Sequence, residues 1–181
     1  MQIITTDGMP PTLRRRLRSL AAMELVNIPL QGVVWFGLAG LPATLPNLVG
    51  FGLFAALLIE GAAYWAAKLH QLRRRRRLPG LSAFRAARAI NPPFLATGVV
   101  ITGYAAATDP GRVSWPGLVF ALFACLEHVN YFHVQLMHDT LSDLRRFRSV
   151  GLRPSHLARD IARARQPPPP AGRSAIQPSD P

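Results

Sequence analysis

The stretch GLVFALFACLEHVNYFHVQLMHD, residues 117–139, decides the fold class of this 181-residue chain. It is apolar enough to enter a lipid bilayer and long enough to cross one, since a membrane-spanning helix needs about 20 residues. Its second half nevertheless carries Glu127, His128, Asn130, Tyr131 and His133. We interpret the stretch as a transmembrane helix with a polar lower half.

The rest of the chain separates apolar residues from charge. Apolar residues make up 49% of the sequence, while the formal net charge is +12. The apolar runs fall at about 20–40, 47–68, 92–108 and 116–138, and nearly all basic residues lie outside them. This pattern is typical of a membrane protein with basic loops. We therefore expect an all-α, polytopic membrane protein with four transmembrane helices in two hairpins and a cytoplasmic amphipathic helical extension.

Four segments follow from this pattern. They are a cytoplasmic N-terminal segment at 1–19, a transmembrane domain at 20–138, cytoplasmic basic helices at 139–166 and a disordered tail at 167–181. The helical pattern of the fourth span continues past His138 without a breaker before Gly151, which predicts one long helix. Ser155 is then expected to cap a short amphipathic helix with Leu157 and Ile161 on one face.

The segment before the third span allows two interpretations. LSAFRAARAI, residues 81–90, is either a surface amphipathic helix capped by Ser82 or a disordered basic loop. Pro92 and Pro93 are expected to open the third span, because proline is tolerated in the first turn of a helix. Within that span, the spacing of Gly98 and Thr102 predicts close approach to a neighbouring helix.

The distribution of basic residues predicts the orientation. Of the 21 Lys and Arg residues, Arg112 alone is expected on the far side. By the positive-inside rule, both termini and the central loop should be cytoplasmic in a bacterial inner membrane. Anionic lipid headgroups are the expected partners of the densest basic run. This run consists of Arg73, Arg74, Arg75, Arg76 and Arg77. Because topology already accounts for these charges, nucleic acid is not expected to bind.

Polar residues inside the spans need a reason, because a charged side chain costs roughly 2.5–3.5 kcal/mol at the centre of a membrane helix. The set is Glu24, Asn27 and Gln31 on the first span, Glu60 and Tyr64 on the second, and Glu127, Asn130 and Tyr131 on the fourth. Glu60 and Glu127 lie at similar depth, so we expect them to face each other and share a proton. The cluster either fixes helix packing or lines a cytoplasm-facing cavity for a proton, cation or small ligand.

A metal or haem site has weaker support in the sequence. His128, His133 and His138 are ligand types that zinc, copper or haem iron accept. However, His128 and His133 are five residues apart and point in different directions on a helix, and there is no HExxH motif. The single cysteine, Cys125, excludes a CxxC site. No cofactor is expected.

No motif in the chain identifies a reaction. GxSxG, a phosphate-binding glycine loop and a usefully spaced serine–histidine pair are all missing from the sequence, so enzymatic activity is not expected. Three classes of function remain open. The favoured class is a non-catalytic scaffold or accessory subunit of a membrane complex with a membrane-protein partner. The alternatives are a small transporter that uses the intramembrane carboxylates and a haem or metal redox protein.

Overall fold

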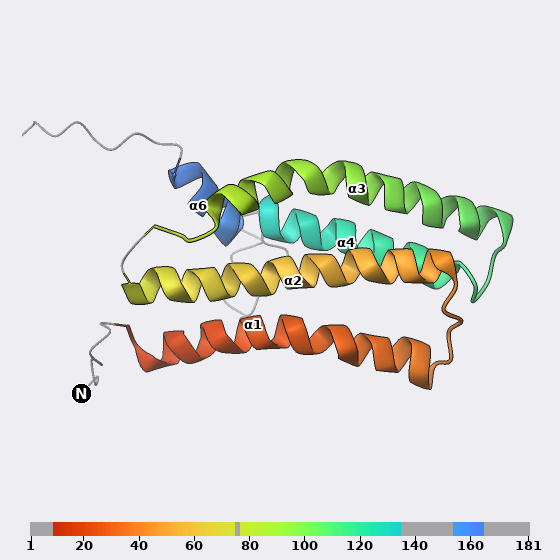
Figure 1. The fold of residues 1–181 in the computed structure, drawn as a ribbon, viewed down its shortest axis with the longest axis horizontal. Helices are drawn as coiled ribbons and strands as arrows, with labels where there is room; N and C mark the ends of the chain where they lie inside the picture. Colours follow the sequence, from red (N-terminus) through yellow and green to blue (C-terminus); the bar gives the residue numbers. More distant parts are fainter. Residues whose placement is uncertain (1–8, 75–76, 135–153, 165–181) are drawn as a thin grey trace, which may run out of the picture.

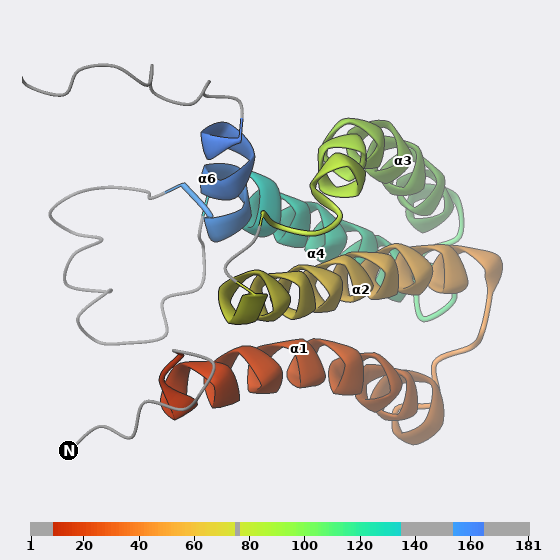
Figure 2. The same ribbon diagram turned by 60° about the vertical axis from the view of Figure 1, so that its left-hand side comes forward.

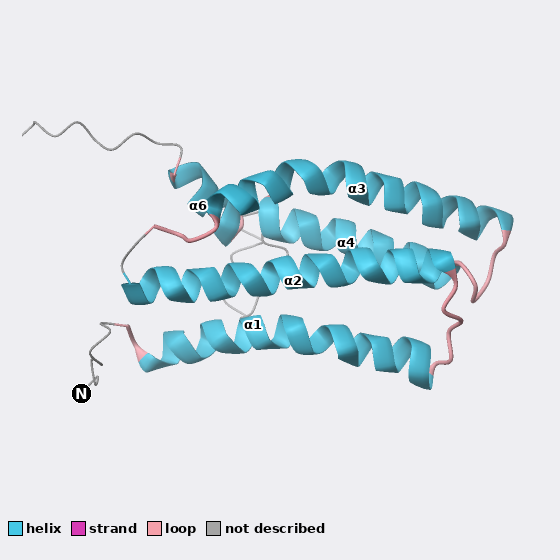
Figure 3. Ribbon diagram, viewed as in Figure 1, coloured by secondary structure: helices cyan, strands magenta, loops and turns pink. Residues whose placement is uncertain are grey.

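The computed structural model describes residues 9–74, 77–134 and 154–164, and every regular element in these ranges is a helix (Figures 1 and 3). The elements are α1 (Pro11–Gly32), the π-helix η1 (Val33–Leu38), α2 (Leu45–Arg74), α3 (Leu81–Thr108), α4 (Trp115–Phe132) and α6 (His156–Arg163). The predicted all-α class is confirmed for the described residues.

α2 is the central helix of the bundle. It packs against α1, α3 and α4, while α3 also packs against α4. Figures 1 and 2 show α2 between α1 and α3, with α4 behind it and α6 beside the end of α4. We call the left end in Figure 1 the arginine end, since α1 begins there and α2 ends there with Arg73 and Arg74. The opposite end, which holds residues 39–44 and 109–114, is the turn end.

Two of the described helices are long and apolar enough to cross a membrane. They are Pro11–Leu38 and Leu45–Arg74, whose most apolar windows have mean hydropathies of 1.3 and 1.7. α3 and α4 do not meet this test of length and composition. The expected membrane character is thus supported by two helices, while four spans remain a prediction.

Several predicted helix boundaries are wrong. The first helix begins at Pro11 rather than near residue 20, with proline in its first turn, where its missing N–H is not needed. α3 begins at Leu81 after Gly80, whose φ of 72° lies in the left-handed region that favours glycine, so Ser82 is not the cap. α3 then runs without interruption through Pro92 and Pro93. Residues 81–90 are therefore the first turns of this helix and form neither a separate surface helix nor a loop.

The fourth helix also ends earlier than predicted. α4 stops at Phe132, and Val134 forms an isolated bridge with Pro154. Two contacts from Ser155 occupy carbonyl groups at the end of α4: its N–H donates to His133 at 3.1 Å and its hydroxyl donates to Tyr131 at 2.5 Å. These bonds occupy acceptors that a continuing helix would use. Residues 135–153, including His138, lie outside the described residues.

α6 follows the predicted pattern. Ser155 caps it by accepting a hydrogen bond from the N–H of Ala158 at 3.1 Å, as expected. Leu157 and Ile161 are both buried and belong to the main apolar core. The amphipathic helix is therefore docked on the bundle through its apolar face.

Glycines permit the closest helix contacts. A Cβ on Gly50 of α2 would lie 1.9 Å from the carbonyl oxygen of Gly117 on α4. A Cβ on Gly98 of α3 would lie 2.1 Å from a methyl group of Leu53 on α2, and Thr102 one turn later is fully buried. The predicted close approach at Gly98 and Thr102 is confirmed.

Hydrogen bonds join the two turns at the turn end. The Asn47 amide donates to the carbonyl groups of Pro42 and Arg112, both at 2.9 Å, and its oxygen accepts from the N–H of Gly117 at 2.8 Å. The Arg112 guanidinium donates to the carbonyl groups of Ala39 and Gly40. Asn47 is fully buried, and its bonds join α2 to the first turn of α4 and to the two turns at this end of the bundle.

Candidate functional site: a groove between α1 and α4

A groove of about 900 Å³ separates α1 from α4. Its two walls are apolar faces of these helices, its floor comes from α2, and its arginine end is covered by the start of α6. The lining includes Leu17, Leu20, Met23, Val26 and Leu30 of α1, Val119, Phe120 and Phe123 of α4, Phe54, Leu58 and Trp65 of α2, and His156 and Leu157 of α6. The groove extends from Arg16 near the arginine end to Trp115 near the turn end.

Six of the predicted intramembrane polar residues line this groove, along with Tyr64 on its floor. On α1, the Gln31 amide donates to Asn27 at 3.3 Å and accepts from the indole of Trp35 at 2.8 Å. Across the groove, the Tyr131 hydroxyl donates to the Glu24 carboxylate at 2.7 Å. This last bond links the two walls directly.

Glu127 lies on the same side of α4 as this link. Its carboxylate accepts a hydrogen bond from the Asn130 amide at 3.3 Å and interacts with both Tyr131 and Glu24. The phenol of Tyr131 is therefore placed between two carboxyl groups that come from different helices. Such an arrangement can hold helices together, and it can also pass a proton between carboxyl groups.

Glu60 has a different environment. Its carboxylate accepts a hydrogen bond from Asn91 of α3 at 2.8 Å, and it does not line the groove. The predicted direct pair of Glu60 and Glu127 is replaced by separate contacts to α3 and to α1. Depth along a helix placed both residues at one level, but it did not determine the side of the bundle that each faces.

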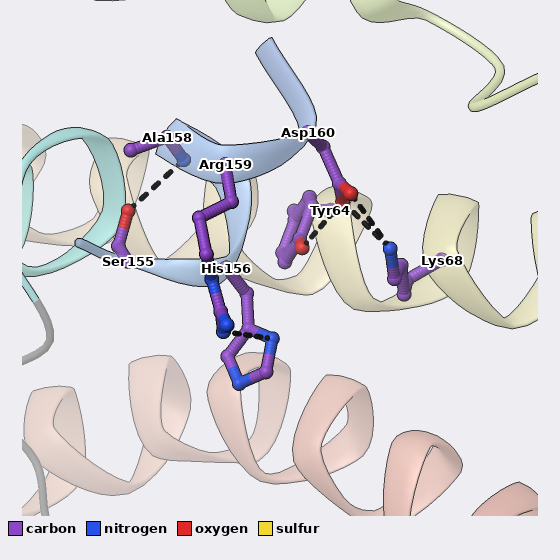
Figure 4. Close-up of polar contacts among 7 residues, drawn as sticks. All are labelled: Tyr64, Lys68, Ser155, His156, Ala158, Arg159 and Asp160. Atoms are coloured by element: carbon purple, nitrogen blue, oxygen red, sulfur yellow. Dashed lines mark hydrogen bonds and ion pairs between the residues drawn. The ribbon is translucent and has the colours of Figure 1, made fainter. Parts of the chain in front are cut away.

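A charged contact that the sequence did not indicate docks α6 on α2 (Figure 4). The Lys68 ammonium donates to both carboxylate oxygens of Asp160, at 2.9 and 2.7 Å, and the Tyr64 hydroxyl donates to the same carboxylate at 2.9 Å. The Lys68 and Asp160 side chains are only 18% and 9% exposed. Because the partners are 92 residues apart in sequence, no local spacing could have revealed the pair.

Replacing Asp160 by asparagine is expected to loosen α6. The substitution removes the charge that Lys68 faces in a partly buried site, where losing one partner is costly. We expect amide hydrogen exchange in α6 to accelerate about tenfold, the factor that corresponds to 1.4 kcal/mol of docking free energy. Mass spectrometry of the exchanged protein measures this rate. Asp109→Asn, at the exposed turn end, should leave it unchanged, and equal rates in both variants would contradict the docking role.

The histidines do not assemble a metal site in the described residues. His128 is buried in the α3–α4 seam, while His133 is exposed at the end of α4. No group of three or more His, Cys, Asp or Glu side chains that could hold a metal ion occurs within residues 9–74, 77–134 and 154–164. His138 lies outside these ranges.

The basic run is described only in part. Arg73 and Arg74 end α2, Arg77 follows, and Arg75 and Arg76 lie outside the described residues. A small hollow of about 210 Å³ beside this run is lined by His70, Arg73 and Arg74. The two arginines give this hollow a positive charge.

No protein-family model, curated protein or solved structure matches this chain.

Proposed function

We propose that this chain is a multi-pass protein of a bacterial inner membrane and serves as a non-catalytic scaffold or accessory subunit. In this proposal α1 to α4 cross the bilayer, the arginine end faces the cytoplasm, and its basic residues contact anionic headgroups. Large apolar side chains are exposed on each of these helices, as lipid contact requires. They include Leu25 and Leu38 in the first helical segment, Ile59 in α2, Phe94 and Val100 in α3, and Leu122 and Leu126 in α4.

The groove between α1 and α4 carries the proposal for a partner. The residues of the first helical segment that line the groove run from Leu13 to Trp35, and at about 1.5 Å per residue this wall is about 33 Å long. A lipid tail reaches only to the middle of a bilayer whose hydrocarbon core is about 30 Å thick, whereas a transmembrane helix crosses all of it. We therefore assign the groove to a transmembrane helix of a partner protein.

The chemistry of the walls favours the same occupant. Helices associate in membranes through van der Waals packing supplemented by a few hydrogen bonds, because lipid tails supply no hydrophobic driving force. The groove offers apolar surface along its length and one set of polar side chains, which are those of Glu24, Asn27, Gln31, Glu127, Asn130 and Tyr131. A partner helix with a small or polar residue beside these side chains would match both features.

Photo-crosslinking in intact cells tests this assignment. A photoreactive amino acid at Val26 or Phe123, which line the groove, should form an adduct whose partner peptide lies within a transmembrane segment of a different protein. The same amino acid at Val100, an exposed position of α3 outside the groove, should give lipid adducts only. Adducts to lipid alone at all three positions, or to a second copy of this chain, would refute the proposed role.

A second candidate, a small proton- or cation-coupled carrier, is favoured by one observation. Glu24, Tyr131 and Glu127 form a continuous polar link in the groove. Glu127→Gln preserves the shape of the side chain and removes its exchangeable carboxyl proton. A carrier should lose function with this substitution, whereas a scaffold should retain it. The haem or metal alternative is decided by an absorbance spectrum and metal analysis of the purified protein.

A further inference from the structure

A second polar cluster lies at the arginine end, in the seam between α3 and α4 and outside the groove. Its centre is His128, whose side chain is only 5% exposed and whose two ring nitrogens both lack a hydrogen-bond partner. The ring packs on Phe132 and on the exposed His133, with centroid distances of 4.8 and 5.6 Å. A buried imidazole without partners is costly, because it has lost its hydration and received nothing in exchange.

Positive charge gathers around this imidazole. Arg88 of α3 lies close enough to interact electrostatically with His128, as does His133. Arg85, one turn before Arg88, has a buried Nε that also lacks a hydrogen-bond partner. We call Arg85, Arg88, His128 and His133 the His–Arg cluster. It gathers hydrogen-bond donors from two helices without a protein acceptor for the buried nitrogens.

The carboxylates nearest in the fold are engaged elsewhere. Glu60 accepts from Asn91, Asp160 pairs with Lys68, and Glu24 accepts from Tyr131. None of these acids appears among the groups that act on His128. Among the described residues, no acceptor is bonded to these buried nitrogens, and a bound anion would supply one.

We propose that the His–Arg cluster binds a phosphate group. Guanidinium groups present a planar set of donors that matches phosphate oxygens, and imidazole N–H groups add further donors. A tetrahedral anion between α3 and α4 would accept hydrogen bonds from the Nε–H of Arg85 and from the one N–H of the His128 ring. The ring of the exposed His133 lies 5.6 Å from the ring of His128, centroid to centroid, and so the cluster extends to the surface of the bundle.

Two sources supply this chemistry, a phospholipid headgroup and free inorganic phosphate. Phe94 and Ile90 follow Arg88 along α3 and are 66% and 51% exposed. The cluster therefore lies at the border of the apolar surface, which is the depth at which lipid phosphates are found. The inference goes beyond the proposed partner-binding role, because it concerns a different seam of the bundle and does not depend on the groove.

Matched variants separate ligand binding from folding. His128→Phe keeps an aromatic ring against Phe132 and removes both unpartnered nitrogens, so without ligand it should be as stable as the wild type or more stable. Arg88→Gln removes the central charge. Arg18→Gln removes one charge from an exposed position of α1 and serves as the control for general electrostatic attraction.

The measurement is thermal unfolding of the full chain in detergent after lipid has been removed. Dioleoylphosphatidylglycerol is added in one arm and sodium phosphate in the other. A ligand at 100-fold excess over its Kd should raise the Tm of the wild type and of Arg18→Gln by about 5–10 °C. His128→Phe and Arg88→Gln should each lose at least half of that rise.

Each outcome decides the proposal. A rise with the lipid alone identifies a headgroup as the ligand, whereas a rise with sodium phosphate that shows the same dependence on the variants identifies the free anion. The proposal is overturned if neither compound raises the Tm. It is equally overturned if His128→Phe and Arg88→Gln retain more than half of the wild-type rise.

Discussion

Gly50→Ala is expected to destabilise the bundle more than alanine at any other described glycine. The new Cβ would lie 1.9 Å from the carbonyl oxygen of Gly117, and 2.7 and 2.8 Å from two further backbone atoms of that residue. Because all three atoms belong to the backbone, no side-chain rotation relieves the clash. α2 and α4 would have to separate, at a cost of about 3 kcal/mol or more in free energy of unfolding.

The matched control is Gly52→Ala in the same helix. A Cβ on Gly52 would meet nothing within 4 Å, so this variant should be neutral or slightly stabilising, since alanine favours helix more than glycine does. Circular dichroism during heating in detergent should show the Gly50 variant melting about 10 °C below the control. Equal melting temperatures would mean that α2 and α4 are not in the close contact described.

Asn47→Ala is expected to have the second largest effect. The substitution leaves the carbonyl groups of Pro42 and Arg112 and the N–H of Gly117 without partners at a fully buried position. Each unsatisfied buried group costs about 1–3 kcal/mol, so we expect a loss of about 3 kcal/mol in total after partial relaxation. Thermal unfolding in detergent measures this loss.

Asn27→Ala provides the comparison for this prediction. Asn27 is also an amide on an expected span, but it is only half-buried and takes part in a single long hydrogen bond with Gln31. Its replacement should lower the free energy of unfolding by less than about 1 kcal/mol. If Asn47→Ala and Asn27→Ala have the same melting temperature, the hydrogen bonds of Asn47 do not stabilise the turn end.

Local sequence patterns predicted the features that depend on local chemistry. The order of the helices, the cap at Ser155 and the buried face of α6 follow from hydrophobic spacing and from the hydrogen-bonding capacity of a serine side chain. The close approach at Gly98 also follows, because a helix surface without a Cβ admits a neighbour. These features can be predicted without knowing which residues of other helices they contact.

Long-range contacts explain the boundaries that the sequence did not reveal. At the end of α4, the hydroxyl group of Ser155, which comes 24 residues after Tyr131, donates to the carbonyl group of Tyr131. α3 passes through Pro92 and Pro93, whose rings lie on the exposed side of the helix and away from its neighbours. Periodicity predicts which residues share a face, but it does not show which distant group competes for a backbone acceptor.

The candidate site was predictable only as a set of residues. Their shared faces indicated that Glu24, Asn27 and Gln31 act together, and these side chains do line one groove. The rotation of each helix about its axis was unknown, and so Glu127 was paired with Glu60 when its neighbour across the bundle is Glu24. The hydrogen bonds of Asn47 were not predicted, because nothing in its sequence neighbourhood distinguishes an amide that joins two turns.

Because the turn end is held by hydrogen bonds, the first helix would pivot about Ala39 and Gly40 if it moved. There, Arg112 holds the carbonyl groups of both residues, and the Trp35 ring packs edge-on against Phe120 of α4 with centroids 6.0 Å apart. Nearer the arginine end, the bond from Tyr131 to Glu24 and the burial of Leu17 hold the same helix. If these contacts open, a tilt of about 10° moves the start of this helix, which is about 42 Å from the pivot, by about 7 Å. An outward tilt of this helix would therefore widen the groove at the arginine end and leave the groove unchanged at the turn end.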